Sequence, residues 1–135
     1  MPRNLYVNLP VKDLARSVEF FTALDFSFNP MFTDENATCM IVNDNTSVML
    51  LVESFFSTFT RKAICNTREA TEALLSLSLD SRAEVDDFIA RAVAAGGVEK
   101  GEATDHGFMY ERGITDPDGH NWGVFHMDES QFPAK

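Results

Sequence analysis

The chain has 135 residues, of which 44% are hydrophobic and 12 are phenylalanine, so it can bury a substantial core and is not a candidate for intrinsic disorder. Its formal net charge of −10 argues against nucleic acid and anionic membrane surfaces as partners. The sequence has neither a long apolar run nor an apolar signal core near residue 1, and its two cysteines form no CxxC pair. We therefore expect reduced thiols and a cytoplasmic protein.

The first half of the chain predicts one helix and four strands. Residues 5–11 alternate, which places Tyr6 and Asn8 on the face opposite Leu9. Asp13 is the expected N-cap of a helix that begins at Leu14. Further strands are expected at residues 26–32, 37–42 and 47–52. Residues 53–71 form a connection rich in phenylalanine, in which we expect a short helix.

The second half repeats this order. Ser81-Arg-Ala-Glu84 is a capping box, so a helix is expected from there to the Gly96-Gly97 pair. Asp116-Pro117-Asp118-Gly119 has the residues that a type I turn prefers, which predicts a hairpin between the last two strands. The expected strands are residues 74–79, 98–103, 107–114 and 121–127.

The two halves also keep a constant offset. The helix starts Asp13 and Ser81 are 68 residues apart (81 − 13), and so are Phe20 and Phe88 (88 − 20) on the matching helix faces. An offset that holds along a whole helix indicates a duplicated βαβββ unit.

Both ends of the chain carry a family pattern. Residues 8–18, Asn-Leu-Pro-Val-Lys-Asp-Leu-Ala-Arg-Ser-Val, resemble the opening of vicinal-oxygen-chelate proteins, and residues 115–119 with the strand after them resemble the closing hairpin. That superfamily includes glyoxalase I, bleomycin-resistance proteins, fosfomycin-resistance enzymes and extradiol dioxygenases. The resemblance implies an α+β fold in which two βαβββ modules form a curled mixed sheet, shaped as an open cup. We expect one glyoxalase-like domain over 1–135, with module one at 1–53, a linker at 54–71, module two at 72–128 and a tail at 129–135.

Enzymes of this superfamily hold a divalent metal in the cup with His or Gln, Glu, His and Glu, one from each of four strands. Carried onto this sequence, the four positions fall on Tyr6, Leu50, Leu74 and Gly123. Leucine and glycine side chains offer no lone pair, and a tyrosine alone cannot hold a divalent ion against water. We therefore predict that the metal site is lost and that no cofactor is used.

The three histidines do not suggest a replacement metal site, because their spacing brings no two of them together. We interpret His120 as a solvent-facing turn residue and His126 as a partly buried structural residue. His106, close to Asp105 and Glu111, is interpreted as part of a salt-bridged surface. No nucleophile is evident, since Cys39 lies in an apolar strand and Cys65 in the connection.

Without a metal, alternation predicts which side chains line the cup. They are mostly apolar, with a few hydroxyl and amide groups, as in ordinary ligand pockets. Gly123 removes a side chain where the superfamily has a carboxylate, which favours room for a ligand, although a filled cup fits the same residues. Phe55, Phe56 and Phe59 are candidates to close the opening or to form a dimer contact. The predicted substrate-binding residues are Tyr6, Asn8, Leu50, Leu74, Ser76, Asn121, Gly123 and Phe125.

Three functions remain open at this point. The first is a metal-free protein of the bleomycin-resistance type that binds a small apolar or aromatic molecule, which the resemblance implies is a homodimer. The second is a lyase or dioxygenase with an atypical site, using an acid–base pair such as Tyr6 with His106 or Glu111. The third is a structural or interaction domain whose cup is simply core. No catalytic residue can be assigned, and whether the protein is an enzyme stays open.

Overall fold

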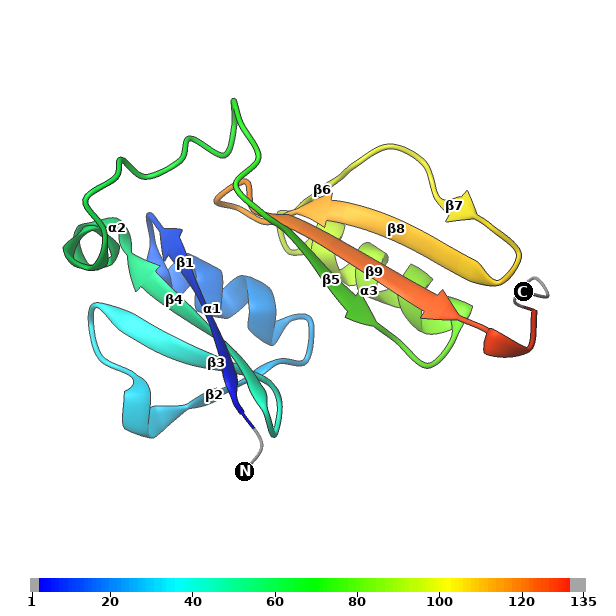
Figure 1. Cartoon of the computed structure of the whole chain (residues 1–135), viewed down its shortest axis with the longest axis horizontal. Helices are drawn as coiled ribbons and strands as arrows, with labels where there is room; N and C mark the ends of the chain where they lie inside the picture. The colour runs from blue at the N-terminus through cyan, green and yellow to red at the C-terminus, as the bar shows by residue number, and fades with distance from the viewer. Residues whose placement is uncertain (1–2, 132–135) are drawn as a thin grey trace. The chain divides into compact units, whose positions relative to one another are not determined.

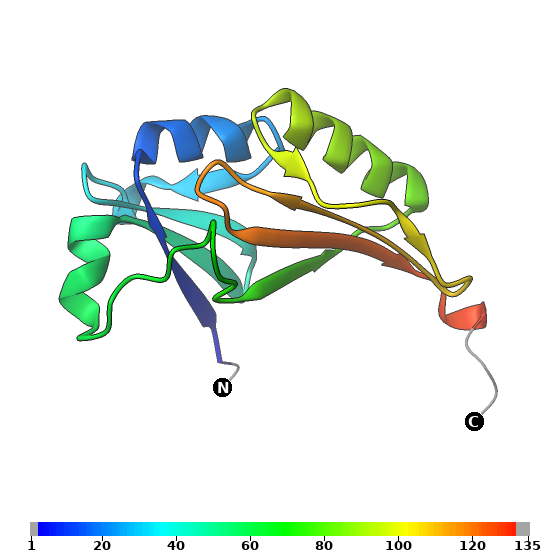
Figure 2. The ribbon, with the colours of Figure 1, turned by 90° about the horizontal axis from the view of Figure 1, so that it is seen from above.

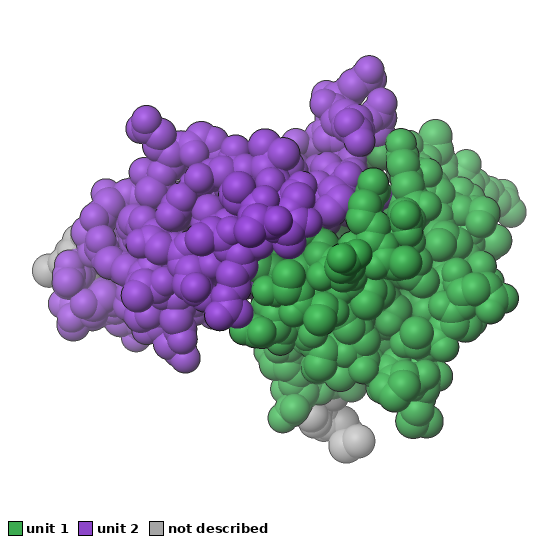
Figure 3. All heavy atoms as spheres, turned by 180° about the vertical axis from the view of Figure 1, so that it is seen from behind, with its two compact units in different colours: residues 1–65 green, residues 66–135 purple. Residues whose placement is uncertain are grey.

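The computed structural model describes residues 3–131 and divides into two compact units, residues 1–65 and 66–135 (Figures 1 and 3). The division falls inside the predicted linker, 54–71. Of the predicted tail, 129–135, residues 129–131 form a short 3-10 helix, and residues 132–135 lie outside the described residues.

Unit 1 is a four-stranded open sheet with one long helix on one face (Figures 1 and 2). The strand order is β1-β4-β3-β2, with β1 parallel to β4 and the other pairs antiparallel. Its elements are β1 (Leu5–Val11), α1 (Leu14–Thr22), β2 (Ser27–Asn29), η1 (Pro30–Phe32), β3 (Ala37–Asn43), β4 (Thr46–Val52), α2 (Glu53–Phe56) and η2 (Ser57–Phe59).

Unit 2 has the same arrangement. Its strand order is β5-β9-β8-β6, with β7 also paired to β8, and β5 runs parallel to β9. The helix α3 covers one face of the sheet (Figure 2). Its elements are β5 (Leu74–Ser78), α3 (Arg82–Ala94), β6 (Val98–Glu99), β7 (Thr104–Asp105), β8 (Met109–Thr115), β9 (Asn121–Met127) and η3 (Glu129–Gln131). The predicted duplicated βαβββ order and the α+β class are confirmed.

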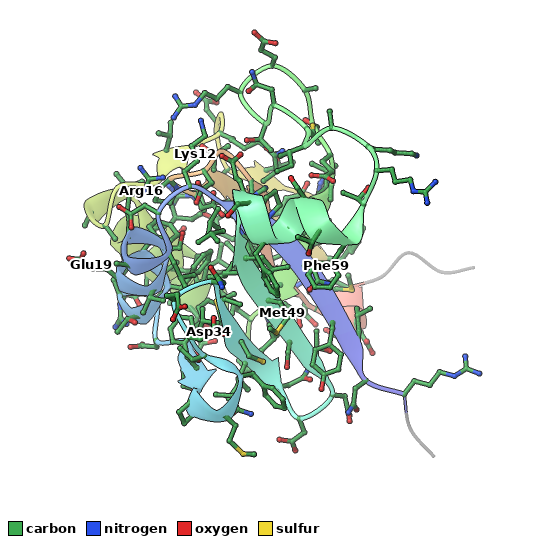
Figure 4. The ribbon with its side chains drawn as sticks, turned by 90° about the vertical axis from the view of Figure 1, so that its left-hand side faces the viewer. Lys12, Arg16, Glu19, Asp34, Met49 and Phe59 are labelled. Carbon is green, nitrogen blue, oxygen red and sulfur yellow. The ribbon has the colours of Figure 1, made fainter. Side chains whose placement is uncertain are left out.

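Both predicted helix N-caps, Asp13 and Ser81, are confirmed. The Asp13 carboxylate accepts a hydrogen bond from Arg16 N at 3.1 Å, and the Ser81 hydroxyl accepts one from Glu84 N at 3.1 Å. Each bond satisfies a backbone donor that the first helical turn leaves without a partner. Arg16 and Glu19 of α1, and Lys12 just before it, are exposed charged side chains on this side of unit 1 (Figure 4).

Two predicted strands are wrong in extent. The strand expected at 26–32 stops at Asn29, because Pro30 starts the 3-10 turn η1, whose first N–H the Asn29 side chain caps at 3.0 Å. The strand expected at 98–103 pairs only at 98–99, and pairing resumes at 104–105. Between them the backbone turns away at Gly101, whose φ of +65° is left-handed and suits glycine.

The helix-facing side of the unit 1 sheet is apolar. The register pairs Leu9 with Leu50 and Val48 with Met40, so these side chains share one face, and they are at most 4% exposed. Phe20 of α1 is 1% exposed and packs into the same core. Among residues 3–131, no helix is long and apolar enough to cross a membrane.

Candidate functional site

A groove of about 320 Å³ lies on the open face of the unit 2 sheet, the face opposite α3; it is called the unit 2 groove below. Its floor is a row of three small residues on neighbouring strands, because the register places Ser76 beside Gly123 and Gly123 beside Gly113. A methyl group built on Gly123 would come within 3.4 Å of the Ser76 hydroxyl. The two glycines therefore leave space where ordinary side chains would fill the surface.

One wall of the groove comes from the interrupted edge strand. Lys100 N still donates to Gly113 O at 2.8 Å, but residues 101–103 have left the sheet. The side chains of Lys100, Glu102 and Thr104 line the groove along this edge, together with Glu111 of β8. The wall thus carries both signs of charge and a hydroxyl group.

The opposite end of the groove is formed by Leu74 and Asn121, which are register partners on β5 and β9. Leu74 is 72% exposed and Asn121 only 8%. The Asn121 side-chain amide has no hydrogen-bond partner among residues 3–131, yet no unpaired side-chain nitrogen or oxygen atom in this range is fully buried. The amide therefore meets solvent through the groove that it lines, and it is available to a ligand.

A second hollow, of about 380 Å³, lies at the start of α3. Its polar groups are already occupied within the protein. Arg82 binds both carboxylate oxygens of Asp105 at 2.6 and 2.9 Å, and the His126 ring Nδ1 donates to Leu79 O at 3.0 Å. Asp128 accepts hydrogen bonds from the turn that follows it. The unit 2 groove is the better candidate site because its amide group is unpaired.

The comparison with known proteins agrees with this architecture. Residues 3–43 match the family described as bleomycin resistance protein-like N-terminal. A hypothetical protein from S. aureus is similar in structure, with a TM-score of 0.79 and 27% identity over 93% of this chain and 95% of its own. The expected resemblance to the bleomycin-resistance and glyoxalase proteins of the vicinal-oxygen-chelate superfamily is therefore confirmed. A search of curated protein sequences found no match.

Two more solved structures have the same fold. A glyoxalase-related enzyme from Fulvimarina pelagi has a TM-score of 0.78 and 19% identity, over 100% of this chain and 94% of its own. An enzyme of the glyoxalase/bleomycin resistance protein/dioxygenase family from Burkholderia phytofirmans has a TM-score of 0.76 and 15% identity, over 90% and 96%. At such sequence identities, structural similarity shows a shared fold but does not show a shared chemistry.

The residues present do not fit the metal of the vicinal-oxygen-chelate enzymes. Two of the four positions carried over from the superfamily are occupied by Leu74 and Gly123, which have no metal-binding atom in their side chains, and a third falls on Leu50, which is buried and has none either. Within the part of the chain that the structure describes, no group of three His, Cys, Asp or Glu side chains is placed to hold a metal ion. We therefore derive no metal-dependent step.

The predicted site residues divide between the two units. Four of them, Leu74, Ser76, Asn121 and Gly123, come together in the unit 2 groove. Phe125 lies on the same sheet face, next to Ser78 in the register, but outside the groove lining. The remaining three, Tyr6, Asn8 and Leu50, belong to unit 1.

The placement of Leu50 in the cup is wrong. Leu50 is paired with Leu9 and is 0% exposed, so it lies in the helix-facing core of unit 1. Tyr6 and Asn8 lie on the other face and are exposed, as predicted. The residues of β4 on their face are those paired with them, Ser47 and Met49, so Met49 and not Leu50 is near the fourth-strand position (Figure 4). A shift of one residue in a strand exchanges its two faces.

The interpretation of His120 as solvent-facing is also wrong, because the residue is only 5% exposed. The cause is the buried carboxylate of Asp116, which accepts hydrogen bonds from His120 N at 3.0 Å and Asp118 N at 2.9 Å. Its second oxygen accepts from the Trp122 indole at 3.0 Å. These bonds draw the start of β9 inward, together with the His120 ring.

The other two histidines are placed as predicted. His126 is half-buried on the helix-facing side of β9, and His106 Nε2 lies 3.3 Å from Glu111 Oε1 in an exposed ion pair. Cys39 is buried and Cys65 is half-buried, and neither forms a disulfide bond within residues 3–131.

Part of the helix-facing side of unit 2 is charged. The Tyr110 hydroxyl donates to Asp86 at 2.6 Å and Arg112 Nη1 donates to it at 2.8 Å, and these bonds hold the pKa of Asp86 below its usual value. Arg112 Nε also donates to Glu99 at 2.9 Å. These residues, with Arg82 and Asp105, are called the charge network below. The guanidinium of Arg82 lies 5.1 Å from the Tyr110 ring centroid.

Sequence reasoning missed the edge wall of the groove and half of its floor. The predicted continuous strand at 98–103 contains Lys100 and Glu102, Thr104 falls between two predicted strands, and Gly113 is predicted only as a strand residue. A signal was nevertheless present. Gly101 lies between two charged residues in the middle of the predicted strand, and a glycine inside a strand pattern indicates a bulge.

Proposed function

We propose that the protein binds a small organic molecule in the unit 2 groove and uses no metal ion to do so. One observation carries the proposal, namely the side-chain amide of Asn121, a residue that is only 8% exposed. This amide has no partner among the described residues and lines the groove. The amide meets solvent through the groove, so a ligand bound there can replace that water with a direct hydrogen bond.

The shape of the groove supports the same function. Its floor is lowered by Gly113 and Gly123, and a volume of about 320 Å³ is at the lower end of the range for small-molecule pockets. The identity of the superfamily adds an expectation of small-molecule binding, since relatives are named for resistance to bleomycin and for glyoxalase activity. Its metal chemistry does not transfer, because the donor residues differ.

An enzyme is the second candidate, and one contact bears on it. Glu111 lines the groove and lies 3.3 Å from His106, which is the geometry of an acid–base pair. The two side chains are 45% and 41% exposed, so water screens them and an ordinary surface ion pair accounts for the contact. Binding is therefore the function that the site supports better.

The test is a thermal-shift screen of small organic compounds in buffer with a metal chelator. A compound at 100 times its dissociation constant adds about 2.7 kcal/mol to the free energy of unfolding. Gly123→Ala places a methyl group 3.4 Å from the Ser76 hydroxyl and should abolish the shifts of true hits. Ser78→Ala is the matched control, because Ser78 is exposed on the same face of β5 but does not line the groove. Hits that survive Gly123→Ala bind elsewhere and contradict the proposal.

The proposal also includes a homodimer. Large apolar side chains are exposed in unit 1, with Met31 84%, Phe32 55% and Phe59 68% exposed. Exposed large apolar side chains, such as the neighbours Met31 and Phe32 in η1, are typical of protein–protein contacts. Light scattering coupled to gel filtration should give twice the mass of one chain, and Met31→Lys with Phe32→Lys should weaken the association. A monomeric mass at all concentrations overturns this part.

A further inference from the structure

We propose that the ligand of the unit 2 groove is a small zwitterion, with an ammonium and a carboxylate group a few bonds apart and an apolar side chain, as in a free amino acid. This inference rests on the proposed function and assigns a chemical class to its ligand.

The first support is the pair of opposite charges on the edge wall. Lys100 and Glu102 both line the groove, two residues apart on either side of the left-handed Gly101. Neither side chain has an ion pair or hydrogen bond with any of residues 3–131. An ammonium and a carboxylate that share a hollow without pairing to each other are both available to a ligand that carries the complementary charges.

The second support is the polar set across the floor. The Asn121 amide can both donate and accept a hydrogen bond, and the Ser76 hydroxyl can do the same. A carboxylate can thus accept from Asn121 and Ser76 while Lys100 balances its charge. The ligand ammonium can donate to the carboxylates of Glu102 and Glu111, which lie on the same wall.

The third support is the apolar end of the groove. Leu74 lines it beside Asn121 and is 72% exposed, so its side chain presents free apolar surface next to the polar set. Covering this surface with a ligand side chain is favourable because it removes apolar area from water. The ligand class therefore has a charged end and a short hydrocarbon chain.

Other charge types fit less well. An anion could pair with Lys100 but would also face the carboxylates of Glu102 and Glu111, and a cation could pair with these carboxylates but would also face the Lys100 ammonium. A neutral aromatic molecule would take all three charged groups partly out of water without pairing any of them, which is unfavourable. Only a ligand that carries both a negative and a positive charge can pair with Lys100 and with the carboxylates of Glu102 and Glu111.

The experiment uses four matched probes on the whole protein, labelled with nitrogen-15 for NMR titration. L-leucine carries both charges, N-acetyl-L-leucine only the negative one, L-leucinamide only the positive one, and N-acetyl-L-leucinamide neither. We expect L-leucine to shift the backbone amides of Ser76, Gly113 and Gly123, with an affinity about tenfold higher than that of any other probe.

Variants locate the two charges. Lys100→Ala should weaken L-leucine binding about tenfold and reduce its advantage over L-leucinamide, which lacks the carboxylate. Glu102→Ala should also weaken it about tenfold and reduce its advantage over N-acetyl-L-leucine, which lacks the ammonium. Lys62→Ala is the control, because Lys62 is an exposed lysine of unit 1 and should leave the titration unchanged.

Two results overturn the inference. If N-acetyl-L-leucinamide binds as well as L-leucine, the groove takes a neutral ligand, and the proposed function survives without the zwitterion. If none of the four probes shifts the groove amides, the zwitterion is likewise rejected. The proposed function itself fails only if the compound screen also finds nothing that binds in the groove, so the two failures are distinguishable.

Discussion

Units 1 and 2 have the same strand order and the same helix position, but their interiors differ. In unit 1 the side of the sheet that faces α1 is apolar, with Leu9, Met40 and Leu50 at most 4% exposed. In unit 2 only part of that side is apolar, around Trp122 and Val124, and the rest is held by the charge network. The open face differs as well, because unit 2 has a glycine-floored groove.

The difference shows how a duplicated module can change its role while its topology stays. Core burial contributes stability in proportion to apolar area, so an apolar unit 1 is suited to hold the fold. Partly exposed ion pairs contribute little to stability, so the charged half of unit 2 adds less. The second unit has instead kept polar side chains and small residues, which a binding surface needs.

The largest expected effect tests the core of unit 1. Leu50→Ala should lower the free energy of unfolding by about 2–5 kcal/mol, since it removes a fully buried side chain and leaves a cavity. Tyr6→Ala, on the exposed face of the neighbouring strand, should lower it by less than about 1 kcal/mol. Urea denaturation measures both. A larger loss for Tyr6→Ala than for Leu50→Ala would show that the two faces are assigned the wrong way round.

The next effect tests the hairpin of unit 2. Asp116→Ala should destabilise the protein by about 2–4 kcal/mol, because it leaves the Asp118 and His120 backbone donors and the Trp122 indole without their acceptor. Urea titrations at pH 7 give the value. A loss below about 0.5 kcal/mol would mean that the hairpin does not depend on this carboxylate.

The same residue predicts a pH dependence. Burial raises the pKa of the Asp116 carboxyl, although the His120 ring and the hydrogen bond from Trp122 oppose the rise. The folded state therefore binds this proton more tightly than the unfolded state, whose value is about 3.9. Its contribution favours folding below about pH 4 and is lost as the pH rises through the raised value. As the pH rises through that window, the free energy of unfolding of the wild type should fall relative to that of Asp116→Asn. A rise instead would contradict the effect of burial on the Asp116 pKa.

A smaller effect is expected in the charge network. Arg112→Ala should cost about 1–2 kcal/mol, because its side chain is 21% exposed and its partner Glu99 is 30% exposed, so water compensates part of the loss. Arg91→Ala, which breaks an exposed pair on the same unit, is the control. Equal losses for the two variants, measured by urea denaturation, would remove the distinction between the network and ordinary surface pairs.

The smallest effect concerns the exposed pair Arg82–Asp105. The Arg82 guanidinium lowers the pKa of Asp105 to about 2, so the pair favours folding above the ordinary carboxyl value and stops doing so as the pH falls to about 2. Arg82→Gln should therefore be slightly less stable than wild type at neutral pH, and the two should converge between about pH 4 and pH 2. Acid titrations followed by circular dichroism check this, and added salt should shrink the difference.

Local signals in the sequence were sufficient for most elements. Both helix caps, the turn at 116–119 and the alternation of β5 and β9 depend on residues close together in the chain, and each is confirmed. The 68-residue offset gave the duplicated order for the same reason. Such features follow from backbone chemistry that a single segment specifies.

Features that depend on pairing between distant segments were harder to predict. The face of Leu50 is fixed by its partner Leu9 on β1, and alternation within β4 alone cannot say which set points inward. The buried state of His120 depends on a nearby residue, Asp116, but the sequence does not show whether that carboxylate turns inward or to solvent. The groove wall at 100–104 arises because the chain stops pairing with β8 after residue 99 and pairs again only at 104–105. The hydrophobic pattern of the sequence does not predict such an interruption.

The account depends most on binding without a metal, and elemental analysis of the whole protein tests that directly. Protein purified from metal-supplemented cells without chelator should contain far less than one equivalent of nickel, zinc, iron or manganese per chain. It should also bind its ligand equally well before and after dialysis against EDTA. Close to one equivalent of a divalent metal per chain, together with loss of binding on EDTA treatment, would contradict the account.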